Sequence, residues 1–199
     1  MMTDLPLFPL SSVLLPHGRM PLQIFERRYL DLVRDCMKTG QPFGVVWISR
    51  GSEVSGQGRA APDLGDYGTT ARIVDWDQLP NGLLGITIEG ERRFELCQAT
   101  TRDDGLVIGE VTLSPPLESA PMLDVWQPLV DVLQSLQTHP HVQRMHLSVD
   151  HGNPWQVAYS LVQLLPLEES LKYQLLGIDT LGEVMRELVI ILNQISGED

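Results

Sequence analysis

Hydrophobic residues near the N-terminus occur in short bursts separated by prolines, at residues 5–10, 13–16 and 21–25. Because proline favours extended backbone and disfavours helix, these bursts predict β-strands. The spacing then changes, and apolar residues recur every three or four positions, as on one face of a helix. These residues are Tyr29, Leu32, Val33, Cys36 and Met37. We therefore predict a helix over residues 26–39, ended by Gly40.

Short strands and turns dominate the next seventy residues. Residues 43–48 are almost wholly apolar, which predicts a strand buried on both faces. Residues 50–66 are rich in glycine and predict a long loop. Further strands are expected from residue 67 to 76, from 83 to 89 with Gly90 breaking the strand, and from 106 to 113. Turns are expected at residues 79–82 and 103–105. This pattern favours a small, curved sheet or barrel with one helix.

Residues 115–121 contain three prolines and predict a stiff connector between two subdomains. The β-rich subdomain is expected at 1–114 and a helical bundle of about four helices at 122–199. Asn153 before Pro154 predicts a helix start, and Thr180 with Glu183 predicts a capping box. Pro128 is tolerable only where a helix begins just before it or is kinked there. The fold class expected is α+β, with a mixed β pseudo-barrel followed by the helical bundle.

The charge of the chain limits the classes of partner. The formal net charge of the 199 residues is −12, and only 3 of the 14 basic residues follow residue 115. Nucleic-acid binding depends on lysine and arginine displacing counterions from phosphates, so no nucleic-acid partner is expected. No basic leader or apolar run of about 20 residues is present, which indicates a cytoplasmic chain without a membrane partner. Cys36 and Cys97 are expected to be buried, reduced thiols.

The opening run resembles the hallmark of the Lon-protease N-terminal domain, an LPLFPL segment followed by LLP and then LPLxIFExRY. Residues 68–73 are similar to the GTxAxI strand of that family, and residues 82–94 to its hairpin. The segments at residues 164–167 and 172–176 are similar to its helical part, although Gly177 stands where the family has Glu. The resemblance implies a PUA-like pseudo-barrel followed by helices. It also implies a role in recognising polypeptide substrates.

The motifs of the other Lon domains are absent from this sequence. It contains neither a GxxxxGK[ST] phosphate loop nor the PxDGPSAG nucleophile segment. The two lysines, Lys38 and Lys172, fall on predicted helices outside the apolar stripes, which does not suit a Ser-Lys dyad. We therefore expect a chain that is not an enzyme and needs no cofactor. Four histidines between residues 139 and 151 lack a metal-ligand pattern, so no metal is expected.

The sequence favours a binding module for unfolded polypeptide or a specific partner protein, and a Lon-type protease is one candidate partner. Aromatic and basic residues near the glycine-rich loop are the candidate peptide contacts: Trp47, Arg50, Tyr67 and Trp76. The expected site is a shallow groove between the sheet and the bundle that accepts an extended segment. The alternatives are a small-molecule binder or an uncharacterised enzyme that uses a cleft between the subdomains. RNA binding rests only on fold analogy. A monomer or weak dimer is expected.

Overall fold

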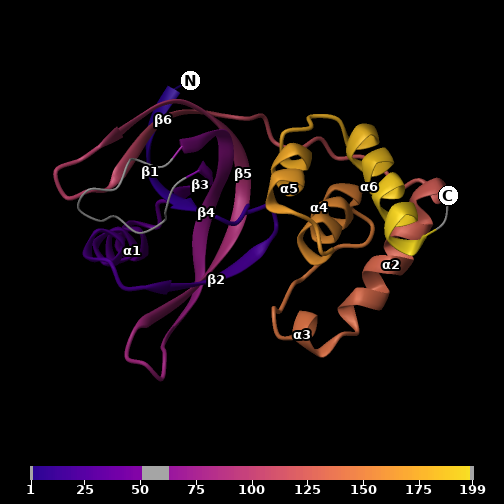
Figure 1. Ribbon diagram of the computed structural model, residues 1–199, viewed down its shortest axis with the longest axis horizontal. Helices are drawn as coiled ribbons and strands as arrows, with labels where there is room; N and C mark the ends of the chain where they lie inside the picture. The colour runs from indigo at the N-terminus through magenta and orange to yellow at the C-terminus, as the bar shows by residue number, and fades with distance from the viewer. Residues whose placement is uncertain (1, 51–62, 198–199) are drawn as a thin grey trace. The chain divides into compact units, whose positions relative to one another are not determined.

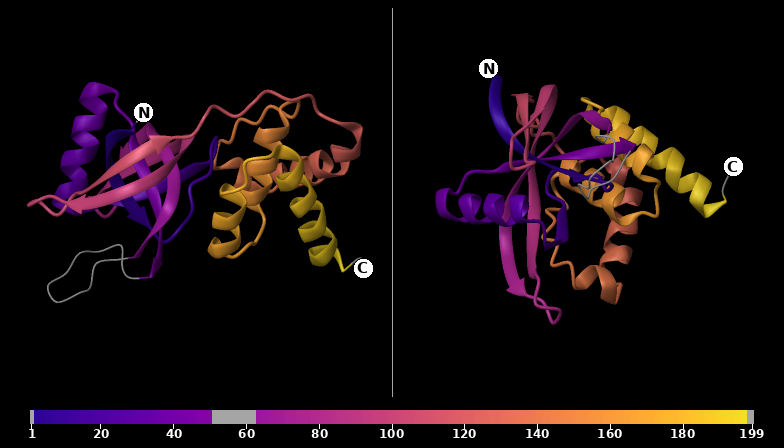
Figure 2. Two further views of the ribbon diagram at one scale, coloured as in Figure 1. Left: turned by 90° about the horizontal axis from the view of Figure 1, so that it is seen from above. Right: turned by 60° about the vertical axis from the view of Figure 1, so that its left-hand side comes forward.

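The computed structural model describes residues 2–50 and 63–197. Within this range the chain forms two compact units, divided after Pro116. Figure 1 and Figure 2 show strands and one helix in the first unit and helices in the second. The loop expected at residues 50–66 falls mostly on residues 51–62, which lie outside the described residues.

A mixed six-stranded sheet forms the first unit. Its elements are β1 (Met2–Leu10), β2 (Arg19–Ile24), α1 (Arg27–Thr39), β3 (Phe43–Arg50), β4 (Asp63–Gln78), β5 (Leu84–Thr101) and β6 (Val107–Leu113). The strand order is β2-β5-β4-β3-β1-β6, and a further pairing of β5 with β6 closes the sheet on itself. This closure confirms the small, curved sheet or barrel that the alternation of short strands and turns predicts.

Helix α1 lies where the apolar spacing predicts it. Gly40 ends the helix in the left-handed conformation, with φ of 70°, and its N–H donates to the Cys36 carbonyl. Tyr29 is buried and stacks on Phe8, with ring centroids 3.8 Å apart. Met37 differs from the prediction, because 48% of its surface is exposed. The buried stripe therefore narrows toward the C-terminal end of α1.

Two strand boundaries differ from the sequence prediction. Strand β4 begins at Asp63, four residues before Tyr67, because Leu64 packs on a cluster of core residues that includes Phe94. Strand β5 continues through Gly90 instead of ending there. At Gly90 the Leu15 carbonyl oxygen occupies the space that a Cβ would need. The glycine is required for this close approach, not to end the strand.

Strand β3 starts later than both of its neighbours. Its second residue, Gly44, pairs with Leu7 of β1, and its first residue, Phe43, pairs with Ala71 of β4. Residues 2–6 of β1 and 72–78 of β4 therefore extend past the start of β3. On the sides that face β3, neither stretch has a strand partner among the described residues. The end of α1 and the link into β3 lie beside this gap.

The predicted turns are confirmed. In the β4–β5 hairpin, Gly82 has φ of 83° and donates to the Leu79 carbonyl, and Leu83 donates to the Asn81 side chain. In the β5–β6 hairpin, Gly105 also has φ of 83°. Positive φ at both positions suits glycine, which has no Cβ to clash.

The second unit is helical. It contains η1 (Asp124–Trp126), α2 (Gln127–Gln137), α3 (Pro140–Gln143), α4 (Pro154–Leu164), α5 (Glu169–Leu176) and α6 (Leu181–Ser196). Helix α4 contacts α2, α5 and α6, and its residues are buried on nearly all sides, as for a central helix.

The helix ends of this unit follow most of the predicted signals. Pro128 lies in the first turn of α2, and the Asn153 side chain accepts N–H bonds at the start of α4, as predicted. The prediction of a capping box at α6 is wrong in detail. The Thr180 hydroxyl contacts the Glu183 carboxylate at 2.5 Å and makes no side-chain bond to the helix backbone.

Three further predictions concern cysteines, metals and membranes. Both thiols were expected to be buried, but Cys36 is only half-buried and Cys97 is exposed, because it lies on the outer face of β5. Over residues 2–50 and 63–197, no group of three or more metal-ligating side chains could hold an ion. In the same residues no helix combines the length and the apolar character that a bilayer crossing requires.

Candidate functional site

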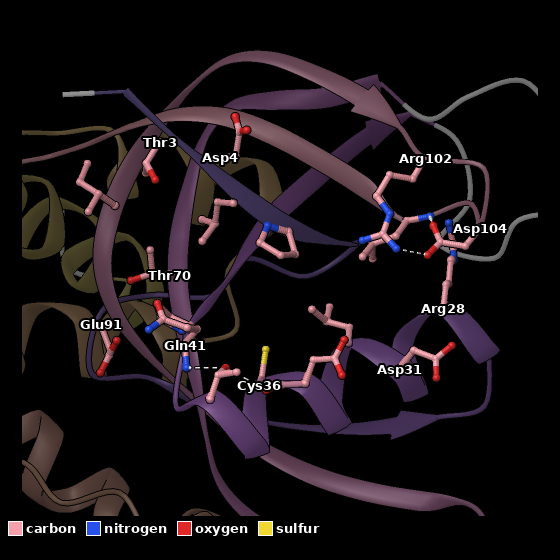
Figure 3. A pocket seen from close by; sticks show the side chains of 18 of the residues that line it. Thr3, Asp4, Arg28, Asp31, Cys36, Gln41, Thr70, Glu91, Arg102 and Asp104 are labelled. Atoms are coloured by element: carbon pink, nitrogen blue, oxygen red, sulfur yellow. Dashed lines mark hydrogen bonds and ion pairs between the residues drawn. The ribbon is translucent and has the colours of Figure 1, made fainter.

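A pocket of about 520 Å³ lies between α1, the open part of β1 and the β5–β6 turn. We call it the α1 pocket. Figure 3 shows Thr3 and Asp4 of β1 on one side of it and Asp31 and Cys36 of α1 on the other. Leucines from three elements form its buried apolar surface: Leu5, Leu32 and Leu106. The volume is within the range of small-ligand sites, so the pocket can accept a side chain or a small molecule.

Arg28 closes one end of the α1 pocket. Its Nε donates to Glu26 at 3.1 Å, and its Nη1 donates to the Gly105 carbonyl at 2.7 Å. The guanidinium also lies 4.4 Å from the centroid of the Tyr29 ring, which is a cation–π distance. With its side chain only 9% exposed, Arg28 links the first turn of α1 to the β5–β6 turn. It is therefore a positioning residue.

The other two arginines of the α1 pocket also have partners in the fold. Arg102 contacts Asp104 at 2.5 Å, and Arg92 donates to the Ser114 carbonyl at 2.6 Å. Five carboxylates line the pocket against these three arginines: Asp4, Asp31, Asp35, Glu91 and Asp104. Three of these carboxylates also contact arginines outside the lining: Asp31 and Asp35 contact Arg34, and Glu91 contacts Arg72. By formal count the lining is still acidic, which favours a cationic group over an anionic one.

Cys36 is the one thiol in the lining of the α1 pocket. Burial raises its pKa to about 11, and the charge of the neighbouring Asp35 adds to the rise. The thiol is therefore protonated at neutral pH and is a poor nucleophile. The described residues that line the pocket include no histidine, lysine or serine. Two of its three threonines use their hydroxyls within the fold, since Thr39 donates to the Asp35 carbonyl and Thr70 accepts from the Arg92 N–H.

An ion-pair cluster supports the strands behind the α1 pocket. Glu89 of β5 accepts from Arg19 Nε at 2.8 Å and from Arg72 Nη2 at 2.6 Å, and Arg72 also contacts Glu91 at 3.3 Å. Partial burial alone would raise the pKa of Glu89. The hydrogen bonds and charges of both arginines outweigh burial and hold that pKa below its usual value. The cluster ties β2, β4 and β5 together.

The four residues predicted as peptide contacts do not form one cluster. Trp47 and Arg50 lie on β3, and Tyr67 lies near them on the paired strand β4. Trp76 lies nine residues farther along β4, which is about 30 Å of extended chain. Trp47 is half-buried and its Nε1 donates to the Ser11 carbonyl, whereas 60% of Trp76 is exposed. The four therefore mark two separate regions of the sheet.

No residue pattern in the sequence predicted the α1 pocket. Its lining comes from residues 3–6, 28–42, 70, 91–92, 102–106 and 113, so no local motif contains it. The available signal was the placement of Arg28 and Asp31 beside the apolar stripe of the predicted helix. That signal does not show what faces the helix, because the facing residues come from distant strands.

Comparisons with known proteins agree with this fold. Residues 4–194 match the family model described as the ATP-dependent protease La (LON) substrate-binding domain. A crystal structure of a Lon N-terminal domain protein from Xanthomonas campestris superposes with a TM-score of 0.74. It is 36% identical, and the match covers 94% of this chain and 98% of that one. The N-terminal domain of Lon protease from the Mycobacterium avium complex has a TM-score of 0.63 at 17% identity and supports the fold alone. Its match covers 94% of this chain and 96% of that one.

Sequence relatives include complete Lon proteases. The chain is 31% identical over 118 residues to the Lon protease of Porphyromonas gingivalis, and 32% identical over 95 residues to Lon protease 2 of Myxococcus xanthus. The matches cover 59% and 47% of this chain but only 14% and 11% of those proteins. The chain therefore belongs to the family of the Lon protease substrate-binding domain.

Proposed function

We propose that the β-rich unit binds extended polypeptide without catalysing a reaction on it, and that the α1 pocket takes up a side chain of that polypeptide. The observation that carries this proposal is the position of the pocket beside residues 2–6 of β1, on the side where β1 has no strand partner among the described residues. A polypeptide there would find unpaired backbone groups and a side-chain pocket together.

The chemistry of the pocket supports a particular kind of side chain. Leu5, Leu32 and Leu106 give it an apolar surface, and carboxylates outnumber arginines around it. The stem of a lysine or arginine would lie against the leucines while its cationic head meets Asp4 or Asp35. The family suggests a Lon-type protease as a partner that would receive such a polypeptide. The absence of an activated nucleophile in the described lining supports binding without catalysis.

A small cationic molecule is a second candidate ligand. The volume of about 520 Å³ supports it, because small-molecule pockets fall in this range. In that case the pocket would recognise the cation by the same carboxylates, without backbone pairing to β1.

Binding of a permanently unfolded protein tests the proposal. The probe is fluorescein-labelled lysozyme, reduced and alkylated with iodoacetamide, and fluorescence anisotropy gives its Kd. Thr3→Trp places a large side chain in the α1 pocket, whereas Thr100→Trp places the same side chain on an exposed position of β5 that does not line the pocket. We expect Thr3→Trp to weaken binding at least tenfold and Thr100→Trp to change it less than twofold.

The same assay separates the two ligand classes. If neither the unaltered protein nor the control binds the unfolded probe, polypeptide binding is wrong. Thermal unfolding with arginine amide then tests the second candidate. A rise in Tm that Thr3→Trp abolishes, without any binding of the unfolded probe, would favour the small cationic molecule.

A further inference from the structure

The last part of β4 presents an unpartnered strand edge that is separate from the α1 pocket. Strand β5 pairs with β4 as far as Gln78, but β3 pairs with it only as far as Ala71. Along the exposed edge lies a groove of about 350 Å³, between residues 72–76 of β4 and the end of α1 at residues 36–41. Five extended residues span about 17 Å, which is enough to pair with a short peptide strand.

The outward-facing amides of this edge are occupied by local carboxylates. Leu79 donates its N–H across the hairpin to the Leu83 carbonyl. Backbone groups alternate between the two edges of a strand, so the N–H groups of Asp77 and Asp75 also point toward β5. The backbone N–H groups of Trp76 and Gln78 therefore point toward the open edge. Their N–H groups donate to the side chains of Asp75 at 2.8 Å and Asp77 at 2.7 Å. Each carboxylate thus takes the place that a carbonyl oxygen of a neighbouring strand would fill.

The register of β4 also changes at this edge. Ile73 pairs with Ile88 and Asp75 pairs with Thr87, so Val74 is an extra residue that forms a bulge. Bulges and charged side chains are common on strand edges, where they limit uncontrolled pairing. On the opposite side of this sheet, the outer strand β2 contains Pro21, which has no N–H to offer. Residues 72–78 of β4 contain no proline, so each of them has an N–H, and those of Trp76 and Gln78 are held by side chains that can move.

Arg72 and Asp75 are the charged residues that line the groove, and Asp77 follows on the same strand. Arg72 is already paired with Glu89 and Glu91, so Asp75 and Asp77 bear on the kind of partner. A second copy of this chain would bring its own Asp75 and Asp77 close to the first pair, and like charges on adjacent strands are destabilising. The net charge of −12 adds to this repulsion. A segment with lysine or arginine would instead pair with the carboxylates. Trp76, 60% exposed, and Met37, 48% exposed, offer aromatic and apolar contact.

We propose that residues 72–78 of β4 bind an extended, lysine- or arginine-containing polypeptide segment by strand addition. The carbonyl oxygens of the segment accept the N–H groups of Trp76 and Gln78, and the released carboxylates of Asp75 and Asp77 turn to its cationic side chains. This inference rests on the proposed polypeptide binding, and it names the chemistry of the segment and a second contact region. The end of α1 connects the two regions, because Cys36 and Gln41 line both the α1 pocket and this groove.

Three labelled ten-residue peptides test the inference by fluorescence anisotropy. The first alternates lysine and valine, the second alternates glutamate and valine, and the third repeats the first with every amide N-methylated. Strand addition predicts that the lysine peptide binds at least tenfold more tightly than either of the other two. If the N-methylated peptide binds as tightly as the unmethylated lysine peptide, strand addition is wrong, since backbone pairing would then contribute nothing.

Variants of the protein complete the test. Asp75→Asn with Asp77→Asn keeps side-chain acceptors but removes both charges, and should weaken lysine-peptide binding at least fivefold. Glu118→Gln with Asp131→Asn makes the same change of net charge in the helical unit and should change binding less than twofold. Unaltered binding by the first variant would overturn the inference. If Thr3→Trp still weakens binding of unfolded lysozyme in that case, the proposed function stands without this edge; if no polypeptide binds at all, both are wrong.

Hydrogen exchange provides a readout that a general charge effect does not change. Saturating lysine peptide should slow exchange of the Trp76 and Gln78 amides at least tenfold relative to amides of the helical unit. Exchange that is unchanged at both positions while the peptide is bound would place the peptide elsewhere.

Discussion

The carbonyl oxygen of Leu15 lies where residue 90 would carry its Cβ, so the backbone of the 11–18 segment packs directly on Gly90 of β5. Two hydrogen bonds keep the segments together: His17 donates to the Gly90 carbonyl at 2.8 Å, and Gly90 donates to the Gly18 carbonyl at 2.9 Å. The contact joins the chain before β2 to the strand that β2 pairs with.

Gly90→Ala should therefore destabilise the β-rich unit by about 2–3 kcal/mol, because backbone atoms cannot yield as a flexible side chain can. Urea unfolding measures the change. Gly182→Ala in α6 is the matched control, since nothing lies within 4 Å of its added methyl group. That control should be neutral or stabilising by about 0.5 kcal/mol. Equal stability of the two variants would show that the Leu15 contact imposes no constraint.

Replacing Arg28 should loosen the end of the α1 pocket. Arg28→Lys keeps the charge but has no planar group to bond Glu26 and the Gly105 carbonyl together. We expect a loss of about 1–3 kcal/mol in the free energy of unfolding, measured in urea. Arg27→Lys is a suitable control because the Arg27 side chain is 94% exposed. A loss of similar size in both variants would contradict the linking role of Arg28.

Stability should depend on pH through Glu89. Its pKa is lower in the folded protein than in the unfolded chain, so the folded state holds the charged form more strongly. This contribution is fully present above the unfolded pKa of about 4.3 and is lost as pH falls through the folded value. Glu89→Gln should cost about 1–2 kcal/mol at pH 7. The difference from the unaltered protein should shrink below about pH 4. A difference that stays constant down to pH 2 would contradict this account.

The two thiols should differ in reactivity. Cys36 is half-buried with a pKa raised to about 11, whereas Cys97 is exposed. At pH 7.5 a maleimide should modify Cys97 first, as peptide mass spectrometry can show. Modification of Cys36 should become about tenfold faster with each pH unit up to about 10. A ligand in the α1 pocket should slow it further, because Cys36 lines that pocket. Faster labelling of Cys36 than of Cys97 at pH 7.5 would contradict the prediction.

The sequence predicted those elements that depend on residues close together in the chain. The three- and four-residue spacing before Gly40 identified α1, and the turns at Gly82 and Gly105 follow from backbone conformations that glycine adopts easily. Gly90 was predicted to end a strand, but glycine also permits a close approach between distant segments, and that is its use here. Nothing in the local pattern distinguishes the two uses, because Leu15 is brought to Gly90 only by the fold.

The candidate sites were harder to predict for a similar reason. Trp76 was predicted as a peptide contact because it is aromatic. It is exposed on a part of β4 beyond Ala71, where β3 no longer pairs with it, and this depends on the relative lengths of the two strands. The α1 pocket depends on the same late start of β3. Strand lengths are set by packing across the whole sheet, so a single strand's sequence does not disclose where its neighbour stops.

The carboxylates of Asp75 and Asp77 also bear on solubility. A bare strand edge can pair with the edges of other molecules and begin aggregation. In this protein the β5–β6 pairing closes the sheet, and the edge that keeps its donors carries two carboxylates on its own amides. These acidic residues act as gatekeepers, because they occupy amides that another strand edge would otherwise bind.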